Sequence, residues 1–166
     1  MTHFFKLENT IQHYDWGSSR MIPELLGQEN SALTPWAELW MGIHPGAPSI
    51  CIDDEKNRKI SLPNVIKEDA EFYLGDETIK AFGTLPFLFK VLSADKPLSI
   101  QAHPNLEQAR AGWDRENKAG IDIKASNRNY KDANHKPEIM CALSPFTAMC
   151  GFREPSEIEK LLAILH

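Results

Sequence analysis

The chain has 166 residues, of which 42% are hydrophobic and 25% are charged. This balance is typical of a globular domain, excludes a disordered, collagen-like or coiled-coil chain, and allows a core without disulfide or metal cross-links. Asp and Glu (23) outnumber Lys and Arg (18), so with a net charge of −5 neither a nucleic acid nor an anionic membrane surface is expected as the main partner.

Short apolar or β-branched runs near Pro or Gly predict strands, and apolar residues at helical spacing between capping residues predict helices. In chain order the predicted elements are strands at 39–43 and 49–52, a helix at 61–75, strands at 87–92 and 98–103, a helix at 105–120, and strands at 138–143 and 148–152. Regular β-α alternation and nucleotide-binding glycine motifs are absent. The sequence therefore predicts a mainly β domain with helical additions.

A last helix is predicted at the end of the chain. Ser156 followed by Glu159 has the spacing of a capping box. The apolar stripe of this helix consists of Ile158, Leu161, Leu162 and Leu165. It reaches His166 without a Gly or Asn stop, which suggests a chain cut short. We expect a first domain at 1–155 and, at 156–166, the start of a helical region.

The segment 98–103 places three polar side chains on one face if it is a strand. Ser99, Gln101 and His103 alternate with apolar residues. The Gln101 amide oxygen and a His103 ring nitrogen could then bind one metal ion. A polar outer face of a half-exposed sheet is the commoner explanation of the same pattern.

A single lysine, Lys90, interrupts the apolar run 87–92. Burying an unpaired ammonium group is costly. Lys90 therefore either extends its stem to reach water or meets an anion in a pocket.

The segment 130–138 carries a second group of candidates. Pro137 excludes a helix and favours extended backbone at Lys136, so that Lys136 and Glu138 share one face and His135 takes the other. In most proteins such a pair is a surface ion pair. Beside a metal ion, Glu138 would be a ligand and the positive charge would favour a neutral Lys136 amine, which could act as a base.

Features of localisation are few. No apolar run approaches the ~20 residues needed to cross a bilayer, and the segment from Met1 to Lys6 lacks a secretory signal pattern. The three cysteines, Cys51, Cys141 and Cys150, form no Cys-x-x-Cys pair. We therefore expect a cytoplasmic protein with three buried, reduced cysteines and no membrane association.

Taken together, four motifs resemble one family over nearly the whole chain. They are Tyr14-x-Trp16-Gly17, Ala37-Glu38-Leu39-Trp40-Met41-Gly42-x-His44-Pro45, Pro86-Phe87-Leu88-Phe89-Lys90-Val91-Leu92 continued by Ser99-Ile100-Gln101-x-His103-Pro104, and Tyr130-x-Asp132-x-Asn134-His135-Lys136-Pro137-Glu138. In this order they resemble the type I phosphomannose isomerases. The last motif is highly specific, whereas Tyr-x-Trp-Gly alone would mean little.

The resemblance implies a cupin-type β-barrel with short helices, incomplete in this chain, with most of the metal site within 1–155. It implies one Zn²⁺ ion held by Gln101, His103 and Glu138, and by a fourth ligand, a histidine that lies beyond these residues. His166 is the only histidine after Glu138 and is not assigned to that position.

The resemblance also implies the substrate site and the reaction. Lys90 and Ser99 match positions near the sugar phosphate, and Trp16 matches a position in the active-site lining. Lys136 is the candidate for proton transfer and Glu38 is its competitor. The implied activity is that of an aldose-ketose isomerase in mannose metabolism.

The implied enzyme is a mannose-6-phosphate isomerase, which interconverts mannose 6-phosphate and fructose 6-phosphate through an enediolate. We expect this chain to be incomplete and inactive alone. Two alternatives stay open: a metal-binding cupin module or sugar-phosphate sensor without catalysis, and a fragment that reassembles with the missing C-terminal part.

Overall fold

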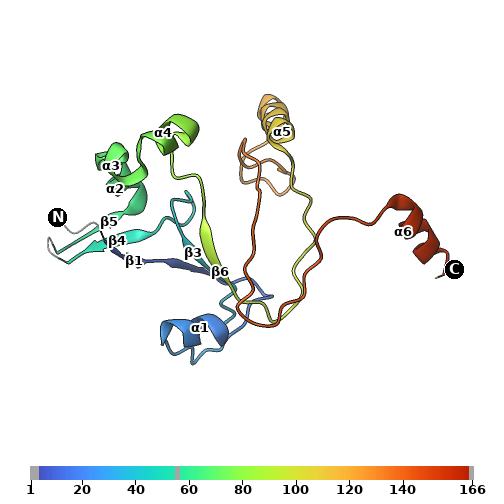
Figure 1. Cartoon of the computed structure of the whole chain (residues 1–166), viewed down its shortest axis with the longest axis horizontal. Helices are drawn as coiled ribbons and strands as arrows, with labels where there is room; N and C mark the ends of the chain where they lie inside the picture. Colours follow the sequence, from blue (N-terminus) through green and yellow to red (C-terminus); the bar gives the residue numbers. More distant parts are fainter. Residues whose placement is uncertain (1–3, 55–56, 165–166) are drawn as a thin grey trace. The chain divides into compact units, whose positions relative to one another are not determined.

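The computed structural model describes residues 4–54 and 57–164, which form two compact units divided between Ile100 and Gln101 (Figure 1). The first unit contains every strand of the described residues together with four short helices. The second unit contains two helices joined by a long irregular segment.

Two antiparallel three-stranded sheets organise the first unit. One sheet has the order β1-β4-β5 and is formed by Lys6–Glu8, Ile50–Asp53 and Arg58–Ser61. The other has the order β2-β3-β6 and is formed by Thr10–Gln12, Glu38–Met41 and Phe89–Leu92. The chain passes from the first sheet to the second at Asn9, whose side-chain oxygen accepts a hydrogen bond of 2.7 Å from the Ser49 hydroxyl.

The core of the first unit consists of small and branched apolar side chains. Ile22, Leu39, Cys51 and Val65 are each at most 6% exposed. Gly17 bridges to Ala94 and lies so close to Ala37 that a Cβ atom at residue 17 would meet the Ala37 Cα at 2.5 Å. The glycine of the Trp-Gly motif is therefore required by backbone packing.

Four short helices accompany the sheets: α1 (Met21–Leu26), α2 (Leu62–Glu68), α3 (Ala70–Leu74) and α4 (Asp76–Phe82). The last three follow one another, and α2 contacts β4 and β5 (Figure 1). The helix predicted at 61–75 is thus divided at Asp69. The Asp69 carboxylate accepts a hydrogen bond of 3.1 Å from the Phe72 amide, so this residue starts a new helix instead of continuing the old one.

The second unit begins with α5 (Leu106–Lys118), where the prediction is confirmed. Asn105 and Gln108 form a reciprocal capping box. The later helix α6 (Pro155–Leu162) also exists, but its predicted capping box is wrong because Ser156 lies inside the helix and the N-cap is Glu154. Pro155 at the start of α6 explains the shift, since proline suits the first turn. Leu165 and His166 lie outside the described residues.

Three predicted strands are not found. The segments 98–103, 138–143 and 148–152 are irregular, and none of them pairs with a strand of the described residues. Their apolar side chains are correspondingly exposed, with Ile139 at 101% and Leu143 at 87%. The expectation of buried cysteines is confirmed for Cys51 and wrong for Cys141 and Cys150, which lie in these segments.

Small antiparallel sheets with short helices are the predicted kind of architecture. Among the described residues, no helix combines the length and apolarity that a bilayer crossing requires.

Candidate functional site

The second unit contains a cavity of about 350 Å³ between the segment that precedes α5 and the segment that follows it. Several of its lining side chains are polar and include Gln101, His103, Asn129, Asp132, Asn134 and Lys136. Residues from two of the sequence motifs therefore meet in one concave place, which is where a small-molecule site is expected.

The imidazole of His103 is held at both of its nitrogens. Nδ1 lies 3.0 Å from the main-chain oxygen of Lys136, and Nε2 lies 3.2 Å from the Gln101 Oε1 atom. A carbonyl oxygen only accepts hydrogen bonds, so the contact with Lys136 fits the tautomer with the proton on Nδ1. In that tautomer Nε2 presents a lone pair toward the amide oxygen of Gln101, so the two atoms are a pair of acceptors that a cation could join.

The separation of these two acceptors also suits a metal ion. Two tetrahedral ligands about 2.0–2.1 Å from zinc lie roughly 3.3 Å apart, close to the 3.2 Å between Nε2 and Oε1. The Nδ1 hydrogen bond to a main-chain carbonyl is the kind of contact that orients a metal-binding histidine. The donor chemistry of Gln101 and His103 therefore fits such an ion.

Glu138 lies near the other side of the ring. Its Oε2 atom is 3.6 Å from His103 Nδ1, and its side chain is 66% exposed. Glu138 thus lies beside Nδ1 of the histidine, whereas Gln101 lies beside Nε2, so the two side chains are on different sides of the ring. Within residues 4–54 and 57–164, no group of three or more His, Cys, Asp or Glu side chains could hold a metal ion.

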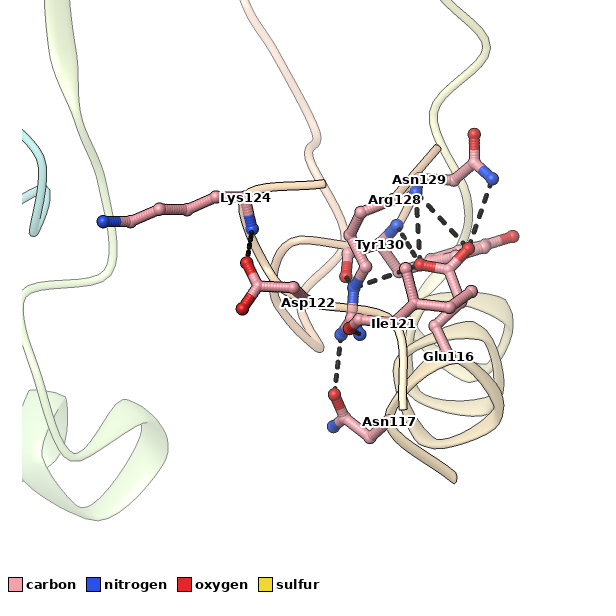
Figure 2. Close-up of polar contacts among 8 residues, drawn as sticks. All are labelled: Glu116, Asn117, Ile121, Asp122, Lys124, Arg128, Asn129 and Tyr130. Atoms are coloured by element: carbon pink, nitrogen blue, oxygen red, sulfur yellow. Dashed lines mark hydrogen bonds and ion pairs between the residues drawn. The ribbon is translucent and has the colours of Figure 1, made fainter. Parts of the chain in front are cut away.

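A buried ion pair that the sequence did not predict supports residues 129–136, which form one wall of the cavity and are called the cavity wall below (Figure 2). Glu116 of α5 pairs with Arg128 at 3.1 Å, with side chains only 6% and 1% exposed. The Glu116 carboxylate also accepts hydrogen bonds from the amides of Asn129 and Tyr130. The bond from the Tyr130 amide is the main reason that the pKa of Glu116 lies below its usual 4.5.

The first unit holds a separate polar group on the β2-β3-β6 sheet. Lys90 of β6 is the cross-strand partner of Trp40 of β3, and Glu38 shares the strand face of Trp40 two residues earlier. The Glu38 Oε2 atom accepts a hydrogen bond of 2.6 Å from Trp40 Nε1 and lies 3.5 Å from Lys90 Nζ. Lys90 therefore meets a protein carboxylate and keeps its side chain 32% exposed.

Trp16 and Ser99 belong to the same unit. Trp16 is half-buried and stacks on Tyr14 with ring centroids 5.7 Å apart. Burial, followed by the charge of Glu38, raises the pKa of Tyr14 above its ordinary 10.0. Ser99 is exposed in an irregular segment, so the expected strand that aligns it with Gln101 and His103 is not what positions it.

Comparison with known proteins decides the family. Residues 4–155 match the family model described as phosphomannose isomerase type I, catalytic domain. The chain belongs to the type I phosphomannose isomerase family. The resemblance inferred from the motifs is thereby confirmed.

Curated relatives agree with the family. The mannose-6-phosphate isomerase of Escherichia coli (strain K12) is 52% identical over 157 residues, which are 95% of this chain and 40% of that protein. The human mannose-6-phosphate isomerase is 40% identical over 167 residues, with 95% and 37% covered. The chain thus spans about 40% of the length of the curated relatives it matches.

Solved structures of the family match as well. A zinc-bound mannose 6-phosphate isomerase aligns with a TM-score of 0.71 at 46% identity, over 79% of this chain and 33% of that one. A Salmonella typhimurium structure bound to fructose 6-phosphate and zinc aligns with the same score and identity, over 80% and 33%. The expected cupin-type architecture with short helices is confirmed by this likeness.

The family's sequence motifs thus fall in two places of this chain. Gln101, His103, Lys136 and Glu138 lie together in the second unit. Glu38 and Lys90 lie together in the first. Sequence reasoning missed Glu116 and Arg128, because a charged residue on a helix is usually solvated and no spacing rule connects it to a loop twelve residues later.

Proposed function

We propose that this chain carries the N-terminal part of the active site of a zinc-dependent mannose-6-phosphate isomerase. The observation that carries the proposal is the meeting of Gln101 Oε1 and His103 Nε2, two acceptors 3.2 Å apart, in a cavity that Lys136 also lines. The family match and the zinc and fructose 6-phosphate bound to a Salmonella relative support it.

Gln101, His103 and Glu138 would hold the zinc ion. This set is two neutral donors and one carboxylate, which leaves zinc with net positive charge. When bound, zinc supplies Lewis acidity toward the carbonyl and hydroxyl oxygens of the sugar. Glu138 is exposed and lies on the Nδ1 side of His103, so it would have to turn to join the ion, and a fourth ligand would come from outside these 166 residues.

Lys90, Ser99 and Trp16 would bind the sugar phosphate. The ammonium group of Lys90 and the hydroxyl of Ser99 are donors suited to phosphate oxygens. Glu38 holds Lys90 at 3.5 Å before the anion arrives. Remote binding energy of this kind can be used to position the reacting carbons of a substrate.

Lys136 would move the proton. Isomerisation removes a proton from the carbon beside the carbonyl and returns it to the neighbouring carbon through an enediolate. Lys136 lines the cavity, and its main-chain oxygen fixes the His103 ring. Glu38 is the competing base, but its carboxylate is engaged by Trp40 and Lys90, which favours Lys136.

The partners follow from the same proposal. The substrate is a sugar phosphate, and the C-terminal part of the enzyme completes the site. Domain limits at 1–155 and 156–166 are supported by the family match, which ends at residue 155. A cytoplasmic location, without nucleic acid or membrane, fits an acidic chain with unpaired cysteines.

The test is isomerisation of mannose 6-phosphate by the metal-stripped chain, with and without added zinc. One arm contains the chain alone, and the other adds the remaining C-terminal portion of the E. coli enzyme. We expect zinc-dependent formation of fructose 6-phosphate in the second arm only. Zinc and sugar-phosphate binding without turnover in both arms would instead indicate a sensor or metal-binding module.

The same assay separates the two candidate bases. Lys136→Met should lower turnover at least a hundredfold, because general-base catalysis contributes about 10²–10⁴-fold. Glu38→Gln should act mainly on KM, through Lys90. Near-normal turnover of Lys136→Met would exclude Lys136 as the essential base.

A further inference from the structure

The interior of the second unit is polar. Among its described residues, Ala109 is the only hydrophobic residue with a buried side chain. The charged residues Glu116 and Arg128, by contrast, are only 5% and 4% exposed. A buried ion pair is weak support for stability, since apolar residues of similar size often do as well. The position of this pair against the cavity wall points to another role.

Arg128 fastens the loop after α5 back onto the helix (Figure 2). Its guanidinium donates hydrogen bonds to the main-chain oxygens of Ile121 and Tyr130 and to the Asn117 side chain, at 2.6–2.9 Å. It also lies 4.7 Å from the centre of the Trp113 ring. Each nitrogen of the guanidinium thus donates a hydrogen bond, and the acceptors lie on both sides of the turn.

Glu116 continues this attachment into the cavity wall. Its Oε2 atom accepts from the Asn129 amide at 3.1 Å and from the Tyr130 amide at 2.9 Å, and Oε1 accepts from the Asn129 side chain at 3.2 Å. Residues 129–136 belong to no helix or strand. The carboxylate therefore supplies the acceptors that a neighbouring strand would otherwise give.

The wall is held at its far end by the functional site. The main-chain N–H of Asn134 donates a hydrogen bond of 2.8 Å to the Asp132 carboxylate, and this bond makes a turn between the two ends of the wall. Lys136 accepts from His103 Nδ1 at 3.0 Å. The eight residues from Asn129 to Lys136 are thus fixed by Glu116 at one end and by the metal-binding histidine at the other.

We propose that Glu116 is a positioning residue, which holds the cavity wall 129–136 so that the Lys136 carbonyl orients His103 for the metal. The inference rests on the proposed function, because it concerns the same cavity and ion. Glu116 touches neither the ligands nor Lys136, and it acts through the backbone of Asn129 and Tyr130.

Two variants of the 166-residue chain separate positioning from stability. Glu116→Gln keeps the volume and one acceptor oxygen but removes the charge. Glu116→Met with Arg128→Met replaces the pair by apolar side chains and removes every acceptor for the wall. The matched control is Glu157→Gln, which breaks the exposed pair of Arg153 and Glu157 in α6.

Zinc affinity is measured by competition with a chromogenic chelator, and thermal unfolding is recorded on the same samples. Loss of a supporting contact to a metal ligand costs about 10–100-fold in affinity. We expect a rise of about tenfold in the zinc Kd for Glu116→Gln and at least as much for the double variant, both still unfolding cooperatively. Glu157→Gln should bind zinc like the unaltered chain.

A second readout needs no metal. The imidazole ¹⁵N signals of His103, assigned with a His103→Gln variant, report which nitrogen carries the proton. The unaltered chain should show Nδ1 protonated, and Glu116→Gln should shift the signals toward an average of the two tautomers. Unchanged His103 signals in Glu116→Gln would overturn the proposal.

Other outcomes are equally decisive. Unchanged zinc affinity in both folded variants would overturn the proposal, and so would a loss of affinity that only accompanies loss of cooperative unfolding. If the unaltered chain binds no zinc either alone or together with the remaining C-terminal portion of the E. coli enzyme, the metal site of the proposed function fails. The positioning role is then judged by the His103 signals alone.

Discussion

At the residue scale, two carboxylates of this chain are important for the hydrogen bonds that they accept. Glu38 binds Trp40 Nε1 and lies beside Lys90, while Glu116 accepts two backbone amides. The two cases differ in consequence: Glu38 lies beside the ammonium group of Lys90, and Glu116 organises the backbone of residues 129 and 130. Both residues are buried, so each requires its hydrogen bonds to offset the cost of burying charge.

Replacement of Glu38 by a neutral residue should lower the pKa of Tyr14. The negative charge of Glu38 contributes to the raised pKa of Tyr14, after burial. In Glu38→Gln that contribution disappears, so the pKa of Tyr14 should fall toward its ordinary value without reaching it, because burial remains. Spectrophotometric titration of the tyrosines, with Tyr14→Phe to identify the signal, measures this. An unchanged Tyr14 titration in Glu38→Gln would show that the carboxylate does not act on the phenol.

At the scale of elements, close packing between side chain and backbone explains a glycine that helix propensity does not explain. Gly112 lies inside α5, where glycine is unfavourable, yet a Cβ atom there would meet the Tyr130 ring at 2.4 Å. The ring also lies 5.6 Å from the Arg115 guanidinium. Helix α5 therefore has glycine at residue 112, although glycine is a poor helix former, because the Tyr130 ring of the cavity wall packs against that position.

Gly112→Ala tests this account. Helix propensity alone would stabilise the protein by about 1 kcal/mol, but overpacking against Tyr130 should reverse the sign and cost about 1–3 kcal/mol. The free energy of unfolding is measured with denaturant. Ala111→Gly, at an exposed position of the same helix, calibrates the propensity contribution. A gain in stability for Gly112→Ala would mean that the ring is not seated there.

At the scale of the whole molecule, the interiors of the two units are stabilised by different kinds of interaction. The first has an apolar interior between sheets and helices, whereas the second is organised around Glu116 and Arg128. In the second unit, long apolar side chains such as Ile139 and Phe152 stay exposed. The second unit should consequently be the more sensitive of the two to conditions that change charge.

Acid should destabilise the second unit. The folded-state pKa of Glu116 is depressed below 4.5, so the unfolded chain binds the proton more readily. The stabilisation from Glu116 is therefore fully present above about pH 4.5 and is lost as the pH falls through the lowered pKa. Amide hydrogen exchange of Tyr130, followed between pH 6 and pH 3 and corrected for intrinsic rates, should show this loss. Glu116→Gln should remove the dependence and Glu157→Gln should keep it.

The sequence by itself determined the family, the central elements and the candidate residues. Motif spacing is local, and so are the features that predict α5, such as its Asn105 cap and apolar periodicity. Only the tertiary structure decided which residues meet: Lys90 with Glu38, His103 with the Lys136 carbonyl, and Glu116 with Arg128. It also decided that 98–103 and 138–143 are not strands here, because a strand needs hydrogen-bonding partners from elsewhere in the chain, which a local pattern cannot specify.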